Sequence, residues 1–420
     1  MRIALVGGQV IDGTGGPAIR DGTVVIEGSR IVEVSDQRES GTDIHVVDVT
    51  GRTVMPGLID CHQHFAPWFQ FLITEQTSSL MYLASRTVDF LRGTLESGVT
   101  TARDMGGLEA GFRDAVANGL LPGPRLKVAL TIIMPTNSFE MLPGIGGIIS
   151  PQELHTRLPG LPSNWCDGPD KARAKVREVL RHGADVIKIM NDGWPTARLR
   201  VDRSPFTQEE LDALVDEAHR AGVPVSAHAY RPNQVMGVLR AGVDSIEEGC
   251  FLDEACVEDM AKRGVWYVPC LSNPRWQASH SPDARNREYS ELLMEGNRRA
   301  FILAMEAGVP IAMGTDSPFV AGHTALESGW MVEAGMTPTE AIATCTGRAA
   351  RFLGMQDQVG TLTPGREADL LVIDGDPLED VGVLADMTRL KLVMQAGVGI
   401  SGEMLGQLPR RPSQLPRPIL

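Results

Sequence analysis

The stretch Val54-Met-Pro-Gly-Leu-Ile-Asp-Cys-His-Gln-His-Phe65 decides how the rest of this chain is interpreted. Its apolar run ends in His62 and His64, which are separated by one residue. If the run is a β-strand, residues two apart share a face, so both imidazoles point the same way roughly 7 Å apart. Two side chains at that spacing can bind one metal ion, but two histidines at a strand end can also be purely structural. The partners found elsewhere in the chain decide between these interpretations.

The same stretch opens a long alternation of strands and helices. Thr207-Gln-Glu-Glu210 and Thr337-Pro-Thr-Glu340 are capping boxes, which are typical of helix starts, and the second has proline at the first helical position. Eight candidate strands alternate with such helical stretches, at 57–64, 99–104, 126–133, 185–190, 224–230, 245–250, 266–271 and 310–316. This rhythm predicts an α/β fold, a (β/α)₈ TIM barrel over residues 57–357.

Both ends of the chain have the chemistry of short strands and turns instead. Residues 1–56 and 358–401 alternate apolar runs with glycine turns, so we expect the two ends to form one small β-sandwich domain beside the barrel. Residues 402–420 form an irregular tail rich in Pro, Arg and Gln, either disordered or an arm on a partner subunit. The Pro- and Gly-rich segment 134–169 is too long for a routine connection, which favours a lid or pocket wall.

Composition limits the partners and the compartment. Acidic residues outnumber basic ones, 53 to 39, for a net charge of −14. That balance argues against nucleic acid or an anionic membrane as the main partner and leaves a small-molecule substrate as the expected one. The six cysteines form no Cys-x-x-Cys pair and no run reaches membrane-spanning length, so we expect a reduced, soluble, cytoplasmic protein. The sequence leaves open whether the chain forms a homo-oligomer.

Chemistry in a barrel enzyme sits at the carboxyl ends of the strands. Each polar residue there also has a structural interpretation: the Lys188 amine could pair with Asp192 or Glu248, His228 could be a satisfied core histidine, and Asp316 could cap a helix. It is much less probable that all these structural interpretations hold at once. The residues found at the predicted strand ends are His62, His64, Lys188, His228, Glu247, Glu248 and Asp316.

These residues lie in motifs that resemble those of the amidohydrolase superfamily, in its prolidase-like and imidazolonepropionase-like branch. The metal motifs are Pro56-Gly-Leu-Ile-Asp-Cys-His-Gln-His64, the strand-borne Lys188, Ala227-His-Ala229 and Gly314-Thr-Asp316. The match extends over nearly the whole chain, through Gly98-Val-Thr-Thr-Ala-Arg-Asp104, Ala241-Gly-Val-Asp-Ser-Ile-Glu247, Glu333-Ala-Gly-Met-Thr-Pro338 and Thr363-Pro-Gly-Arg-Glu-Ala-Asp-Leu370. The resemblance implies a divalent metal centre of one or two ions, with zinc favoured, and carboxylation of Lys188 by CO₂ to bridge two metals.

One departure from the family pattern concerns the sixth strand. The family has a histidine ligand after Ile-Glu, whereas this chain has Glu248 in Ile246-Glu-Glu-Gly249. Three outcomes follow, in order of preference. Glu248 ligates and gives an altered binuclear site; the second metal is weak or absent, leaving one ion on His62, His64 and Asp316; or Glu248 pairs with an unmodified Lys188 and abolishes the bridge.

A second departure follows the third strand. Family members near this branch often have Gly-Gly-His there, whereas this chain has Thr131-Ile-Ile-Met-Pro-Thr-Asn-Ser138. A polar group that usually faces substrate is therefore missing or is replaced by Thr136 or Asn137.

The resemblance also implies a reaction. Metal-bound hydroxide attacks the carbonyl of a peptide-like or N-acyl amino acid amide, with Asp316 as general base and then acid and His228 assisting at the oxyanion. Tyr230 and Arg231 follow His228 and are the predicted substrate-binding residues, with Arg231 holding a carboxylate or simply a solvated loop charge. Arg198 and Arg200 are weaker candidates of the same kind. Because of Glu248, a lyase or isomerase on this scaffold and a catalytically lapsed binding protein are the alternatives.

Overall fold

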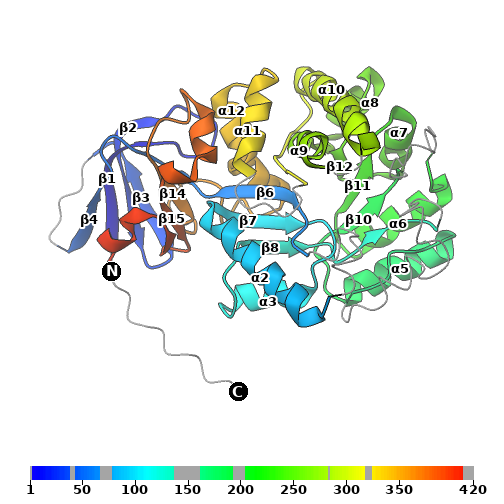
Figure 1. The fold of residues 1–420 in the computed structure, drawn as a ribbon, viewed down its shortest axis with the longest axis horizontal. Helices are drawn as coiled ribbons and strands as arrows, with labels where there is room; N and C mark the ends of the chain where they lie inside the picture. The colour runs from blue at the N-terminus through cyan, green and yellow to red at the C-terminus, as the bar shows by residue number, and fades with distance from the viewer. Residues whose placement is uncertain are drawn as a thin grey trace.

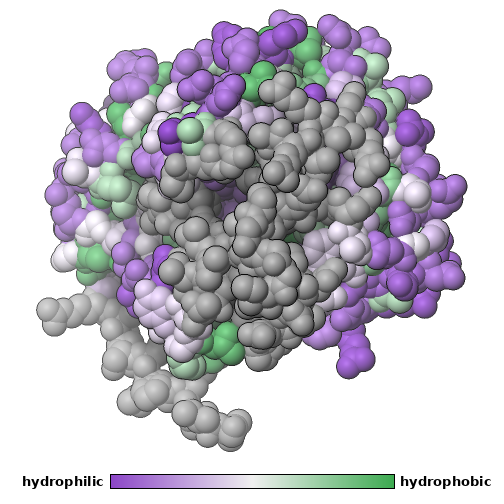
Figure 2. Space-filling model, turned by 45° about the vertical axis from the view of Figure 1, so that its right-hand side comes forward, coloured by the Kyte–Doolittle hydropathy of each residue, from purple (hydrophilic) through white to green (hydrophobic). Residues whose placement is uncertain are grey.

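The computed structural model describes residues 2–37, 43–66, 78–136, 161–192, 204–281, 284–316 and 324–409. Within them, strands from both chain ends gather on one side and alternating strands and helices fill the other (Figure 1). None of the described helices is long and apolar enough to cross a membrane. Figure 2 shows one face of the molecule, and among its coloured residues hydrophilic ones predominate with hydrophobic ones scattered between them.

The two chain ends share one eight-stranded sheet. Its order is β16-β15-β14-β5-β1-β2-β3, with β4 also paired to β1. The antiparallel pair of β5 and β14 joins the two ends, placing Met55 opposite Leu371. The strands are β1 (Arg2–Val10), β2 (Ile19–Glu27), β3 (Arg30–Ser35), β4 (Ile44–Asp48), β5 (Thr53–Pro56), β14 (Leu370–Ile373), β15 (Leu390–Gln395) and β16 (Val398–Ser401).

The predicted β-sandwich is not confirmed, because the pairing gives one sheet and not two facing sheets. The reason lies in β1, whose first half pairs with β4 through Arg2–Val6 and whose end pairs with β5 through Gln9 and Val10. The register with β2 shifts between these halves, at Val6 and Gly8. One bent strand therefore links neighbours that two separate sheets would keep apart. The predicted domain boundaries stay a prediction.

Parallel strands alternate with helices through the middle of the chain. They form a three-stranded sheet, β6-β7-β8, and a five-stranded sheet, β13-β12-β11-β10-β9. Buried residues fill nearly every strand position, as expected when helices cover parallel strands. The strands are β6 (Leu58–Gln63), β7 (Val99–Asp104), β8 (Arg125–Val128), β9 (Ile132–Ile133), β10 (Ile187–Met190), β11 (Val225–Ala229), β12 (Ser245–Glu248) and β13 (Trp266–Val268).

The arrangement is that of a TIM-barrel-like α/β fold, and within the described residues its parallel strands pair as two sheets, so the predicted closed barrel is not confirmed. The third predicted strand is split into β8 and β9 at Leu130, whose φ is +67°. The eighth predicted strand, 310–316, makes a single β-bridge from Ile311 to Tyr267. Backbone hydrogen bonds from Cys61 to the Met313 carbonyl and from Asp316 to the His62 carbonyl (2.9 and 2.8 Å) still set this segment beside β6.

Helices follow the parallel strands, and both predicted capping boxes are confirmed, at Thr207 with Glu210 and at Thr337 with Glu340. The α-helices are α2 (Leu80–Glu96), α3 (Ala110–Ala117), α5 (Pro169–Arg181), α6 (Gln208–Arg220), α7 (Pro232–Ala241), α8 (Glu254–Arg263), α9 (Ser272–His280), α10 (Ala284–Glu306), α11 (Thr324–Glu333), α12 (Pro338–Thr344) and α13 (Gly347–Phe352). Three short 3₁₀ helices lie toward the carboxyl terminus: η2 (Val381–Ala385), η3 (Met387–Arg389) and η4 (Glu403–Gln407).

Candidate metal centre

The two histidines at the end of β6 are held by their Nδ1 atoms. His64 Nδ1 lies 2.9 Å from the Gly106 carbonyl oxygen, which can only accept, so Nδ1 carries the proton. His62 Nδ1 lies 2.9 Å from Glu247 Oε2. Such contacts fix the ring orientation of metal-binding histidines and direct Nε2 toward the ligand. The ring centroids are 5.4 Å apart.

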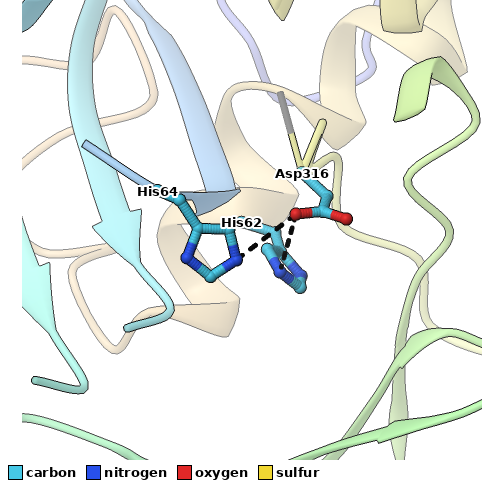
Figure 3. A group of neighbouring side chains, drawn as sticks. All are labelled: His62, His64 and Asp316. Carbon is cyan, nitrogen blue, oxygen red and sulfur yellow. Dashed lines mark ion pairs between the residues drawn. The ribbon is translucent and has the colours of Figure 1, made fainter. Parts of the chain in front are cut away.

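Asp316 faces both imidazoles (Figure 3). Its Oδ1 lies 3.3 Å from His64 Nε2 and 3.7 Å from His62 Nε2. Asn273 Nδ2, at the start of α9, donates to Asp316 Oδ2 and to the Asp316 carbonyl oxygen, both at 2.7 Å. One ligand atom of each of His62, His64 and Asp316 lies within 4.8 Å of the others. Two imidazole nitrogens and a carboxylate oxygen at this separation form a donor set that suits a divalent cation.

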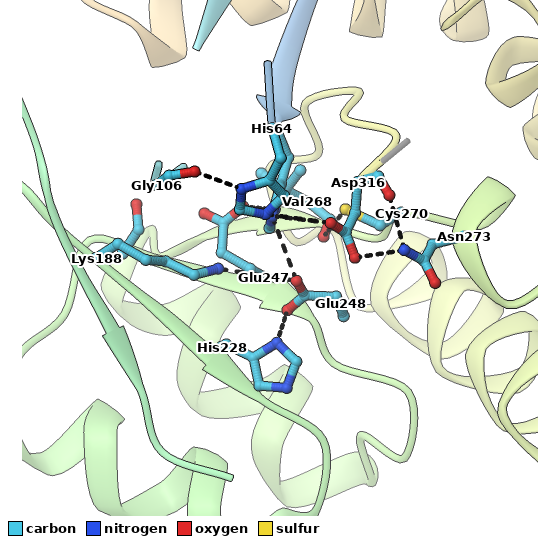
Figure 4. Close-up of polar contacts among 12 residues, drawn as sticks. His64, Gly106, Lys188, His228, Glu247, Glu248, Val268, Cys270, Asn273 and Asp316 are labelled. Carbon is cyan, nitrogen blue, oxygen red and sulfur yellow. Dashed lines mark hydrogen bonds and ion pairs between the residues drawn. The ribbon is translucent and has the colours of Figure 1, made fainter. Parts of the chain in front are cut away.

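Glu248 brings the remaining predicted residues to the same place (Figure 4). His228 Nδ1 lies 2.8 Å from its Oε2, and its Oε1 lies 3.5 Å from His62 Nε2 and 3.8 Å from Lys188 Nζ. Burial alone would raise the pKa of Glu248, but the charges of His228, Lys188 and His62 outweigh it and lower the pKa. The carboxylate is therefore the form present at neutral pH, which is the form that could bind a cation.

Lys188 points an orphaned amine into this group. The residue is 1% exposed, and its Nζ has no hydrogen-bond partner within the part of the chain that the structure describes. At 3.8 Å the contact with Glu248 is an ion pair without a hydrogen bond. Asp192, the other predicted partner of Lys188, accepts a hydrogen bond from Gln234 Nε2 at 3.0 Å. A buried amine without a hydrogen bond is costly, so its surroundings fit a further group bound there.

Three residues of this centre have strained backbones. Glu248, Cys270 and Asp316 have φ of +63°, +51° and +47°, a region that residues other than glycine rarely adopt. Glu248 is the last residue of β12, Cys270 follows β13, and Asp316 ends the segment beside β6. Such residues cost about 1–3 kcal/mol each and cluster at functional sites. The strain therefore marks the same strand ends as the donor atoms.

The chain matches the model of the amidohydrolase family over residues 53–400. It belongs to the amidohydrolase family. An ochratoxinase from Aspergillus niger is 31% identical over 425 residues, covering 95% of this chain and 86% of the relative. A crystal structure of a prolidase complexed with N-methylphosphonate-L-proline is 32% identical with a TM-score of 0.84, covering 95% of this chain and 99% of that one. A Xaa-Pro dipeptidase with bound methionine in the active site is 30% identical, with a TM-score of 0.83 and coverage of 95% and 99%.

These likenesses place this amidohydrolase in the prolidase-like branch, as its motifs predicted. They also show that this protein is a hydrolase that acts on amide bonds. Members of the family generally depend on a metal, and the donor sets around His62 are the places in the described residues where one could bind.

Sequence reasoning missed the charged pair behind His62. Arg103 on β7 is buried and pairs with Glu247 on β12, Nη2 to Oε1 at 2.8 Å. Arg103 also donates to the Cys61 carbonyl at 2.6 Å and to Ser226 Oγ at 2.8 Å. Burial would raise the pKa of Glu247, but Arg103, then His62 and Lys188, hold the pKa well below its usual range. The position of Arg103 inside a strand signalled a buried charge, but the sequence did not show that Glu247 is its partner.

Of the two predicted substrate-binding residues, Tyr230 lies next to His228 and Arg231 lies against Phe251. The ring of the buried Tyr230 is 4.5 Å from that of His228, and burial raises the pKa of its hydroxyl well above the usual value. Arg231, at the start of α7, lies with its guanidinium 5.0 Å from the Phe251 ring. Tyr230 therefore keeps its proton and can donate a hydrogen bond at neutral pH.

Other predicted residues are elsewhere or undescribed. Thr136 is exposed and bonded to Asp167, with Oγ1 to Oδ2 at 2.5 Å, so its hydroxyl is engaged in a loop contact. Asn137, Arg198, Arg200 and most of the predicted lid at 134–169 lie outside the described residues.

Proposed function

We propose that this amidohydrolase is a metal-dependent hydrolase of small N-acyl amino acids or dipeptides, from which it releases the carboxyl-terminal amino acid. The observation that carries the proposal is the convergence of His62, His64 and Asp316, whose ligand atoms lie within 4.8 Å of one another. The relatives support the substrate class, because two of them were solved with N-methylphosphonate-L-proline and with methionine.

His62, His64 and Asp316 would hold one divalent cation, and zinc is preferred by such nitrogen and carboxylate donors. Glu248, His228 and Lys188 are the residues that would hold a second cation. Carboxylation of the Lys188 amine would replace a buried cation by a carboxylate. The buried ammonium without a hydrogen bond would then be gone, and two oxygens that can bind a metal would be added. When bound, the cation supplies Lewis acidity, which lowers the pKa of water and polarises a carbonyl.

Residues of the chain would carry out the proton transfer from the attacking water to the leaving amine. Asp316, whose Oδ2 is held by Asn273, accepts the proton of the attacking water and delivers it to the leaving amine nitrogen. His228 Nδ1 donates to the Glu248 carboxylate, so Nε2 is the ring atom left to face the substrate, and it would donate to the carbonyl oxygen only with both ring nitrogens protonated. His228 is buried, which keeps bulk water from its ring and strengthens its contact with Glu248, whereas the Asp316 side chain is 16% exposed.

Arg231 would bind the substrate carboxylate, with Tyr230 donating to a neighbouring oxygen. We expect the wild-type chain to hydrolyse an N-acyl amino acid faster than the same compound with its carboxylate converted to an amide. In Arg231→Met, kcat/KM for the acid should fall about 10- to 100-fold, because a hydrogen bond to a charged group contributes about 1.5–3 kcal/mol. The measurement is steady-state kinetics on matched acid and amide pairs.

Arg240→Met is the control, since Arg240 lies on the same helix and bonds Gln208 on the surface. It should leave both substrates unchanged. Equal hydrolysis of acid and amide by the wild-type chain would remove Arg231 from this role. Hydrolysis of no N-acyl amino acid or dipeptide would contradict the proposed substrate class.

A further inference from the structure

Cys270 lies two residues past the carboxyl end of β13, and Figure 4 draws it in the same group of side chains as Glu248 and Asp316. Its Sγ, a nitrogen of His62 and a carboxylate oxygen of Glu248 all lie within 4.8 Å of one another, and all three residues are buried. The donor set with His64 and Asp316 does not include this sulfur. Cys270 and Glu248 thus form a second possible ligand set with His62.

We propose that Cys270 Sγ is a metal ligand that, with Glu248 and His62, holds a cation in this chain. The inference rests on the proposed metal dependence and specifies which atoms provide it. Zinc binds cysteine sulfur, histidine nitrogen and carboxylate oxygen alike, so the three donors match its preferences. Where the family's motif has a histidine nitrogen, this chain has the Glu248 carboxylate, and Cys270 adds a soft ligand to that side.

His62 connects this set to the one described above. Its Nδ1 is held by Glu247 at 2.9 Å, so Nε2 is the ring atom facing the centre. That Nε2 lies 3.5 Å from Glu248 Oε1 and 3.7 Å from Asp316 Oδ1. A cation on Nε2 is therefore within reach of donors on both sides. A harder ion favours the carboxylate of Asp316, and a thiophilic ion favours the side of Cys270.

The orphaned amine of Lys188 is an independent sign that a group belongs in this pocket. Its Nζ is buried, has no hydrogen-bond partner among the described residues, and lies 3.8 Å from the same Glu248 oxygen. Among the described residues, the Cys270 sulfur makes one weak hydrogen bond, 3.7 Å from the Val268 carbonyl oxygen. Coordination would break the S–H bond of Cys270, form a sulfur–metal bond and release the proton to solvent.

The test uses Co²⁺ alone as the probe, added to the full chain after chelation. Thiolate bound to Co²⁺ gives a charge-transfer absorption in the near ultraviolet that nitrogen and oxygen ligands do not. We expect this band to grow as cobalt binds to the wild-type chain and to be lost in Cys270→Ser. Cys256→Ser is the matched control, because Cys256 is also buried but lies on α8 with its sulfur against the Pro232 carbonyl. It should keep the band.

Metal content measured on the same samples separates the outcomes. Cobalt bound to the wild-type chain without the band overturns the role of Cys270, and that result needs no variant to fold. An unchanged band in Cys270→Ser overturns it as well. A wild-type chain that retains no cobalt overturns both this inference and the proposed metal dependence. The band together with a failure to hydrolyse N-acyl amino acids supports Cys270 and contradicts only the proposed substrate class.

Discussion

Replacing Asp316 by asparagine is expected to lower kcat/KM for amide hydrolysis at least about 100-fold, the lower end of what acid–base groups contribute. Asparagine keeps the size of the side chain and can still contact Asn273, but it cannot accept a proton from water. The fold should be unchanged, because Asp316 also interacts through its backbone, with N–H to the His62 carbonyl at 2.8 Å. The measurement is steady-state kinetics at saturating zinc, with thermal unfolding as the check on the fold.

Asp114→Asn is the control for Asp316→Asn. Asp114 is an aspartate on α3 whose side chain is 60% exposed and pairs with Arg113, away from the centre. Its substitution should leave kcat/KM within about twofold, since exposed pairs of this kind contribute little. Near-normal turnover by Asp316→Asn would refute the assignment of the proton transfer to Asp316.

Replacing Arg103 by methionine is expected to lower the free energy of unfolding by about 3–5 kcal/mol, because it leaves the Glu247 carboxylate buried without its cation. Glu247 is fully buried and contacts Arg103 and His62 at 2.8 and 2.9 Å. The guanidinium also satisfies the Cys61 carbonyl and Ser226, which would lose donors in the variant. Urea unfolding followed by circular dichroism measures the change.

Arg92→Met is the matched control. Arg92 is half exposed on α2 and reaches Asp89 at 3.6 Å, one turn away. Losing such a surface pair should change the free energy of unfolding by less than about 1 kcal/mol. If Arg103→Met were no more destabilising than Arg92→Met, the buried Arg103–Glu247 pair would not contribute the stability predicted for it.

Local patterns predicted a large part of the centre. The period of two along a strand predicted that His62 and His64 share a face, and their ring centroids are 5.4 Å apart. The rule that parallel strands present their carboxyl ends together predicted that Lys188, His228, Glu248 and Asp316 would meet, and the contacts at Glu248 and Asp316 confirm it. Both kinds of inference depend only on strand order and spacing.

The features that were missed depend on contacts between distant strands. Arg103 and Glu247 are 144 residues apart, and no sequence pattern shows that two buried charges face each other. Cys270 and Asn273 follow a strand that ends at Val268, earlier than predicted, and the left-handed backbone at Cys270 sets where both side chains point. The strand order of the sheet at the chain ends could not be predicted for the same reason, since the pairing of β1 with both β4 and β5 joins segments far apart in the sequence.

The central claim is that a cation held by His62, His64 and Asp316 is required for amide hydrolysis. The most direct measurement is metal content per chain together with the rate of hydrolysis of N-acyl amino acids, before chelation, after it, and after zinc is added back. We predict that rate and metal content fall together and recover together in the wild-type chain, and that His64→Gln does not recover its rate. A chain that holds no metal and still hydrolyses these amides at its full rate would contradict the account.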